Sequence, residues 1–275
     1  MAEWLRPYLA VLSARYSMLL QYRAAAFAGF ATQVFWGAIK VMVMAAFYAL
    51  ATSTPPMSFA AVVAYVWLGQ GLLGLLPWNV DAELSEKMLT GGVAYELLRP
   101  LDLYGFWFAR TLAMRTATTT LRLVPMLLLA MVALPLAGLD RWALAPPASF
   151  ASGVAFFASL AATVALATAI TMVLHVALFW TISGRGINTL ITGLVIVLSG
   201  MVVPLPLFPD WAQTFLYWQP FRGLADVPFR IYSGHIPVDA AAFEIAQQVG
   251  WAAVIVAIGR TVLAFGRSRL VVQGG

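Results

Sequence analysis

The chain has 275 residues, of which 62% are hydrophobic and only 10% are charged. Soluble domains carry about a quarter charged residues, and a single water-soluble core stops growing at about this chain length. This much apolar surface therefore predicts an integral membrane protein. The chain has no cysteine, which excludes disulfides, thiolate nucleophiles and cysteine metal sites. The net charge of +5 comes mainly from arginines at the ends of apolar runs, which argues against a nucleic-acid partner.

Residues 1–23 carry leucine and tyrosine at helical spacing, with three arginines nearby. Arg15 and Arg23 interrupt any apolar run, and no small-residue cleavage site follows one. The segment therefore does not have the pattern of a secretory signal. We expect an amphipathic helix that lies in the membrane interface, with a helix packed on protein as the alternative.

Six apolar stretches follow, each near the length of about 20 residues that a transmembrane helix needs. They cover residues 24–51, 59–78, 113–138, 150–182, 187–203 and 249–265. We expect an all-α membrane protein with six transmembrane helices, formed as a single transmembrane domain over residues 1–275. Two polar intervals, residues 79–104 and 204–248, remain outside the spans. The second is expected to hold short external helices before the last span.

Lysine and arginine are distributed unequally between the two sides of this predicted bundle. Only Arg141, Arg222 and Arg230 fall on one side. Twelve fall on the other: Arg6, Arg15, Arg23, Lys87, Arg99, Arg110, Arg115, Arg122, Arg185, Arg260, Arg267 and Arg269. Because positive residues are enriched in cytoplasmic loops, both termini are expected in the cytoplasm.

The interval 79–104 concentrates acidic residues on the side that otherwise collects arginine. Residues 81–99 of it carry four of the eleven acids of the chain: Asp81, Glu83, Glu86 and Glu96. Residues 81–89 can form a short helix with Leu84, Met88 and Leu89 on one side, ended by two glycines. Such a helix, held under the membrane, could dock a cytoplasmic subunit. A solvated charged linker is the alternative, and spacing alone favours neither.

The order of these features resembles the permease subunits of ABC-2-type exporters. The run TGGVAYELLRPL, residues 90–101, is similar to a Gly-x-x-x-x-x-Leu-Leu-Arg-Pro-Leu stretch in one branch of that class. Residues 219–223 (QPFRG) and 228–234 (PFRIYSG) also resemble that branch. The likeness covers essentially the whole chain.

This resemblance implies that two permease subunits, identical or homologous, pair in the inner (cytoplasmic) membrane, and that a cytoplasmic ABC ATPase docks on each. It assigns ATPase coupling to the helix at residues 81–89, through Asp81, Glu83, Leu84, Glu86, Lys87, Met88 and Leu89. The chain lacks a Gly-x-x-x-x-Gly-Lys-Ser/Thr phosphate loop, so ATP and magnesium are expected on the partner ATPase. We expect a multi-pass exporter of an amphipathic or lipid-like substrate, with no catalytic residue, metal or cofactor of its own.

The interval 204–248 places Trp211, Phe215 and Trp218 along one edge of a helix. Aromatic residues favour the membrane interface, and in the related permeases this region caps the substrate path; a passive anchor in membrane lipid is the alternative. Lys40 lies about 24 Å along the first span, where an ionisable group indicates function, although its stem can also extend toward the interface. We expect these four residues on the substrate path. Lipid-like molecules, peptides, drugs and polysaccharides all fit as substrates.

Three other classes of protein compete with this interpretation. An ion-coupled transporter places acids within its spans, and no acid of this chain falls in mid-span. A membrane enzyme needs converging polar residues, whereas His175 and Lys40 are isolated in the sequence. A channel or membrane scaffold without ATPase coupling remains the alternative, and the acidic helix at residues 81–89 is the feature that distinguishes them.

Overall fold

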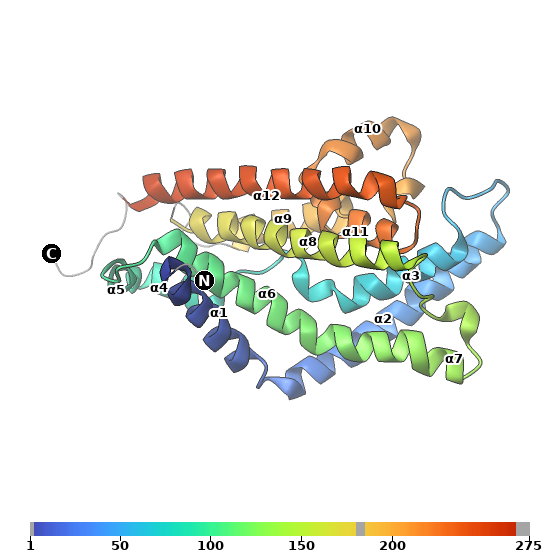
Figure 1. Ribbon diagram of the computed structural model, residues 1–275, viewed down its shortest axis with the longest axis horizontal. Coiled ribbons are helices and arrows are strands. Elements are labelled where there is room, and N and C mark those ends of the chain that lie inside the picture. The colour runs from blue at the N-terminus through green and yellow to red at the C-terminus, as the bar shows by residue number, and fades with distance from the viewer. Residues whose placement is uncertain (1–2, 180–184, 268–275) are drawn as a thin grey trace.

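The computed structural model describes residues 3–179 and 185–267, apart from the side chains of residues 88, 89, 185 and 267. Four helices in this part are long and apolar enough to cross a membrane. They are α2 (Arg23–Ala49), α6 with its continuation (Leu103–Leu136), α8 (Phe150–Ala177) and α12 (Val238–Arg267). They run roughly along the long axis of the molecule, and α12 packs along α8 (Figure 1). The fold is that of a multi-pass membrane protein.

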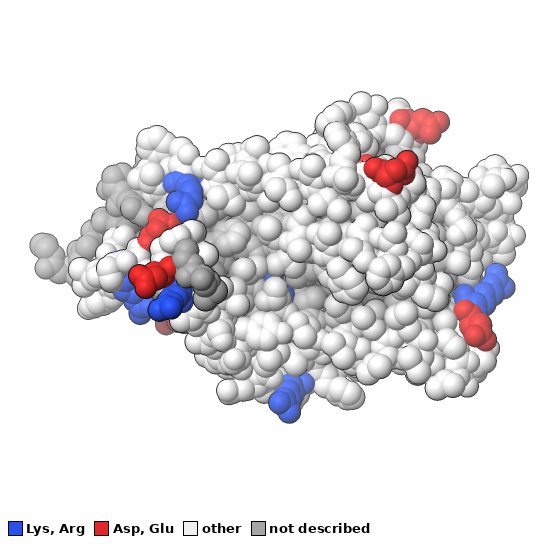
Figure 2. Space-filling view, viewed as in Figure 1, with Lys and Arg blue, Asp and Glu red and all other residues white. Residues whose placement is uncertain are grey.

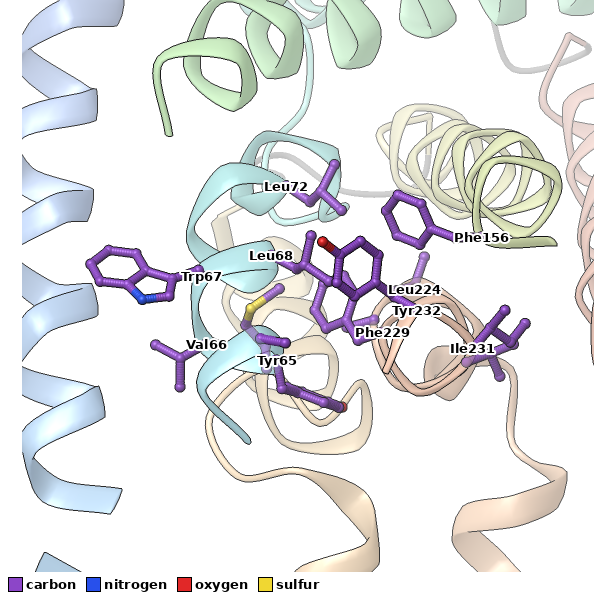
Figure 3. Packing of buried hydrophobic residues seen from close by; sticks show 14 of the residues in the cluster. Tyr65, Val66, Trp67, Leu68, Leu72, Phe156, Leu224, Phe229, Ile231 and Tyr232 are labelled. Carbon is purple, nitrogen blue, oxygen red and sulfur yellow. The ribbon is translucent and has the colours of Figure 1, made fainter. Parts of the chain in front are cut away.

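Two apolar helices are shorter, α3 (Phe59–Gly71) and α9 (Arg185–Leu198). The 13 residues of α3 span about 20 Å, and every residue from Ala61 to Gly71 is buried. An all-round apolar helix is stable only when other elements surround it. In Figure 3, Trp67 of α3 points toward α2, whereas Leu68 and Leu72 lie on the side of α8 and α11. α3 is therefore the centre of the hydrophobic core.

A close approach of backbone and ring holds α2 against α3. A Cβ atom at Gly37 would lie 2.8 Å from the Trp67 ring, so only glycine fits there. On the other side of α3, the ring of Tyr65 meets the ring of Phe229 edge to face, with centroids 5.0 Å apart. Aromatic pairs prefer this geometry.

The remaining elements are short. Toward the end of the molecule that holds α4 lie η1 (Glu3–Leu5), α1 (Arg6–Leu19), α4 (Ala82–Leu89) and α5 (Val93–Leu97). The others are η2 (Leu73–Leu75), η3 (Leu129–Ala133, a π-helix), α7 (Leu134–Leu136), η4 (Asp140–Trp142), η5 (Leu205–Leu207), α10 (Asp210–Trp218), η6 (Pro220–Leu224) and α11 (Asp226–Tyr232). The helix expected near the N-terminus is present as α1, which packs along α6.

Helix boundaries differ from the predicted span boundaries by five residues or more in five places. Helix α6 begins at Leu103, ten residues before the predicted span, because the Asp102 side chain accepts a hydrogen bond from the Gly105 amide at 2.8 Å and caps the helix. Arg110 and Arg115 consequently lie inside α6, and both are buried. Helix α12 begins at Val238, eleven residues early. Hydropathy locates the apolar part of a helix, and a helix can continue beyond it.

Three helices end earlier than predicted. Helix α3 stops at Gly71, seven residues before the end of the predicted span, and α9 stops at Leu198, five residues before. The chain reverses after α9 at Gly200, which has φ +83°, a backbone conformation that favours glycine. The predicted span 150–182 corresponds to α8, which ends at Ala177, five residues early; residues 180–182 lie outside the described part of the chain.

Charge is distributed unevenly over the molecule. Figure 2 shows charged side chains gathered at the end that holds α4 and α5, with a broad and mainly uncharged surface along the middle. The last turn of α12 lies at this same charged end (Figure 1). An uncharged waist with charge at the end is the surface that a bilayer requires.

Candidate functional site

The helix expected at residues 81–89 is present as α4, and its first turn is capped. The Asp81 carboxylate accepts hydrogen bonds from the backbone amides of Glu83 at 3.0 Å and Leu84 at 3.4 Å. Leu84 is 1% exposed and packs in a second apolar cluster with Val93 and Trp107. Leu84 therefore anchors α4 to the bundle.

The acids of this segment do not face outward as a group. Three of them join three cations in a network that we call the six-charge cluster: Asp81, Glu83, Glu96, Arg15, Lys87 and Arg110. Arg110 lies at its centre. Its Nη2 lies 2.9 Å from Glu83 and 3.4 Å from Asp81, and its Nη1 lies 3.7 Å from Glu96. Three negative and three positive groups balance one another. The cluster fixes α1, α4 and α5 onto α6.

Burial is deepest at Glu96 of α5, whose side chain is 3% exposed. Its carboxylate accepts a hydrogen bond from Trp107 Nε1 at 2.6 Å and from Lys87 Nζ at 2.8 Å. Partial burial alone would raise the pKa of Glu83, but hydrogen bonds from Lys87 and Arg110 outweigh this and lower the pKa to about 2. Burial alone would lower the pKa of Lys87, yet its hydrogen bonds to Glu96 and Glu83 raise it.

The start of α4 is also joined directly to the membrane helices. The backbone amide of Asp81 donates to Nε2 of His175 on α8 at 2.8 Å. Just before it, the carbonyls of Leu76 and Asn79 accept hydrogen bonds from the Arg115 guanidinium of α6 at 2.7 and 2.6 Å. Arg115 Nε also donates to Thr171 Oγ1 of α8 at 3.2 Å. Sequence reasoning missed this joint, and the only signal was an arginine two residues inside the predicted span 113–138.

Other side chains of the segment are exposed. Glu86 is exposed, and the structure does not describe the side chains of Met88 and Leu89. On and after α5, Tyr95 is 77% exposed, Leu97 42% and Leu98 82%. We call these three residues the apolar tip. It lies at the charged end of the molecule, where α5 is placed in Figure 1.

The residues expected on the substrate path lie on two helices, Lys40 on α2 and the three aromatic residues on α10. Lys40 Nζ donates a hydrogen bond to the carbonyl of Met201, in the turn after α9, at 3.2 Å. Trp211, Phe215 and Trp218 lie on α10, which confirms the expected helix, and their side chains are 85%, 61% and 57% exposed. Of these four, Trp218 also lines a polar cavity beside α11 and α12. Within the described part of the chain, no group of His, Cys, Asp or Glu could hold a metal ion.

The long apolar helices, the uncharged waist and the charged end define a multi-pass membrane protein. Residues 34–274 match the family model described as "ABC-2 family transporter protein". The chain belongs to this family and is an ABC permease subunit, which confirms the resemblance found in the sequence. Members are transmembrane components that associate with separate ABC ATPases. A search of curated proteins finds no match.

Proposed function

We propose that this permease is an exporter driven by ATP hydrolysis in a separate cytoplasmic ABC ATPase, which docks on the segment formed by residues 79–104. The observation that carries the proposal is the apolar tip at the charged end of the molecule. Exposed apolar residues on a soluble surface mark contact sites. The family association with ABC ATPases supplies a partner of the right kind.

The six-charge cluster gives this docking site a mechanical role. Because three salt-bridged acids hold α4 and α5 onto α6, a push on the apolar tip moves the whole segment as one body. The contacts of Asp81 with His175 and of Asn79 with Arg115 then pass the displacement to α8 and α6. Small shifts at packed interfaces of this kind produce rigid-body tilting of helices.

We further propose six membrane crossings, in which α3 and α9 are the short ones. A helix shorter than the hydrocarbon core of about 30 Å is tolerated where neighbouring helices, rather than lipid, surround its ends. The burial of α3 supports this. We also propose that the protein lies in the inner membrane, with both termini in the cytoplasm and α1 in the membrane interface. Cysteines introduced at Ser53 and Ser233 should then both react with an external label.

Two copies, or one copy and a homologous permease, are proposed to pair around the substrate path. Lys40, Trp211, Phe215 and Trp218 are proposed to contact an amphipathic or lipid-like substrate at the outer half of the membrane. The exposure of the three aromatic side chains is compatible with lipid or with a second permease beside them. A channel or scaffold without an ATPase remains the competing function.

Purification from the native membrane in mild detergent tests the coupling. The tagged wild-type chain should retain a stoichiometric ABC ATPase, and the double variant Tyr95→Ser/Leu98→Ser should lose it. Phe150→Ser is the matched control, because Phe150 is 90% exposed at the start of α8 and away from the segment. Retention of the ATPase by the double variant would contradict docking at the apolar tip. Absence of any ATPase from the crosslinked wild type would favour the channel or scaffold.

A further inference from the structure

A polar cavity of about 380 Å³ lies among α10, α11 and α12. This volume falls in the range of small-molecule sites, about 300–1,000 Å³. Its wall includes four charged side chains and two aromatic rings: Arg222, Asp226, Arg230, Glu244, Tyr217 and Trp218. The cavity belongs to the segment opposite the proposed ATPase surface, and none of these charged residues takes part in the six-charge cluster.

The four charged side chains form an alternating chain of ion pairs. Arg230 Nη1 lies 3.1 Å from Asp226 Oδ2, Arg222 Nε lies 3.7 Å from the same oxygen, and Arg222 Nη1 lies 2.9 Å from Glu244 Oε2. The two middle members each make a further hydrogen bond. Asp226 also accepts a hydrogen bond from the Tyr65 hydroxyl at 3.4 Å, and Arg222 also donates to the Tyr217 carbonyl at 3.2 Å.

The two end members keep unused hydrogen-bonding capacity. Arg230 has five N–H donors available in principle, its contact with Asp226 uses one nitrogen, and its Nε has no partner among the described residues. Its side chain is 21% exposed, against 4% for Arg222. At the other end, Glu244 uses Oε2 for the ion pair with Arg222, and no hydrogen bond to this carboxylate occurs in the described part of the chain. The alternating series of ion pairs thus ends in a cation at Arg230 and an anion at Glu244, each with unused hydrogen-bonding capacity.

We propose that this cavity binds a zwitterionic phospholipid headgroup, with the phosphate at Arg230 and the ammonium at Glu244. A purely anionic ligand would meet the carboxylates of Asp226 and Glu244, and a purely cationic ligand would meet two guanidiniums. A zwitterion extends the alternation at both ends and leaves the cavity neutral. The aromatic face of Trp218 offers the ammonium a cation–π contact as well.

The position of the cavity favours a lipid over a soluble zwitterion. Trp218 lines the cavity and is also 57% exposed, on the same helix as the exposed rings of Trp211 and Phe215. Exposed tryptophans of membrane proteins lie at the level of the lipid headgroups. The acyl chains of a bound lipid would then extend along the apolar surface beside α10.

Lipid retention by the purified chain, without any ATPase, tests this inference separately from the proposed coupling. The chain is incubated in uncharged detergent with equal amounts of phosphatidylethanolamine and phosphatidylglycerol, and native mass spectrometry measures the bound lipid. Arg230→Gln and Glu244→Gln should each reduce phosphatidylethanolamine binding about tenfold, as expected for the loss of one charge-assisted contact. Arg141→Gln and Asp239→Asn are matched controls, because both residues are exposed and neither lines the cavity.

Each outcome decides the inference. Selective binding of phosphatidylethanolamine that both cavity variants weaken and both controls keep supports it. Equal binding of the two lipids, or binding that only Arg230→Gln weakens, overturns the zwitterion in favour of an anion. Equally strong competition by soluble glycerophosphoethanolamine overturns the lipid source. If a cavity variant does not fold, the lipid preference of the wild type and this competition still give the answer.

Discussion

The centre of the six-charge cluster offers the sharpest test of how the proposed coupling segment is held. Replacing Arg110 by methionine keeps an unbranched apolar stem, removes the guanidinium and leaves Asp81, Glu83 and Glu96 with only two cations. Removing one partner of a buried ion pair costs about 3–5 kcal/mol. Glu83 is 44% exposed and can be solvated again, so we expect about 3 kcal/mol, toward the lower end of that range. This free energy should appear as local release of α4 and α5 from α6.

A single cysteine measures that release, since the wild-type chain has none. Val93 is fully buried against Trp107 and its neighbours, and Val93→Cys is a small change. A label reaches this thiol only when the segment opens. Because every 1.4 kcal/mol is tenfold, Arg110→Met should accelerate labelling by about a hundredfold. Arg110→Lys should fall between the two, because it keeps the charge and loses the planar fork.

The matched control is Arg141→Met in the same Val93→Cys background. Arg141 is exposed at the opposite end of the molecule, with its guanidinium over the Phe59 ring at 5.2 Å. Its removal should not change the labelling rate at residue 93. Equal rates for Arg110→Met and the wild type would refute the argument that the cluster holds the segment in place.

Three further predictions concern stability and the role of one lysine. The pKa of Glu83 is lowered from 4.5 to about 2. Its contribution to stability should therefore be complete above about pH 4.5 and disappear as the pH falls toward 2, seen as a shrinking difference in Tm between wild type and Glu83→Gln. Gly37→Ala forces a Cβ to 2.8 Å from the Trp67 ring and should destabilise by about 1–3 kcal/mol, whereas Gly250→Ala, with open space around it, should leave Tm unchanged or slightly higher. Lys40→Met leaves the Met201 carbonyl unpaired after α9 and should cost about 1–3 kcal/mol in thermal unfolding. Because Lys40 is proposed to contact the substrate, the variant should also alter substrate selectivity; a lower Tm with unchanged selectivity would contradict that contact.

Much of the helical framework could be predicted from the sequence, because apolar runs and proline breakers are local signals. Helix α2 begins and ends within two residues of the predicted span, and α8 begins at the predicted residue, Phe150. The helix at α10 followed from three aromatic residues at helical spacing. The early start of α6 could not be found in the same way, because its first turns carry Arg110, which hydropathy places outside a span.

The proposed coupling segment illustrates where local patterns stop being informative. The sequence located α4 and its acids correctly, and the resemblance assigned all of them to an ATPase interface. In the structure Leu84 is anchored in the core, while Asp81 and Glu83 are paired with Arg15 and Arg110. Nothing local indicates that residue 15 or residue 110 lies beside residue 81. The apolar tip at residues 95–98 was inside the quoted motif, but its exposure was not visible.

The sequence by itself determined the membrane class, the positions of most helices and the family, because composition, hydropathy and short motifs are properties of contiguous chain. Tertiary structure decided which charged residues are paired and which remain free. The six-charge cluster joins α1, α4, α5 and α6, and the alternating chain from Arg230 to Glu244 joins α11, η6 and α12. Ion pairs form between side chains within about 4 Å in space, whatever their separation in sequence. For that reason both candidate sites became visible only when the helices were packed together.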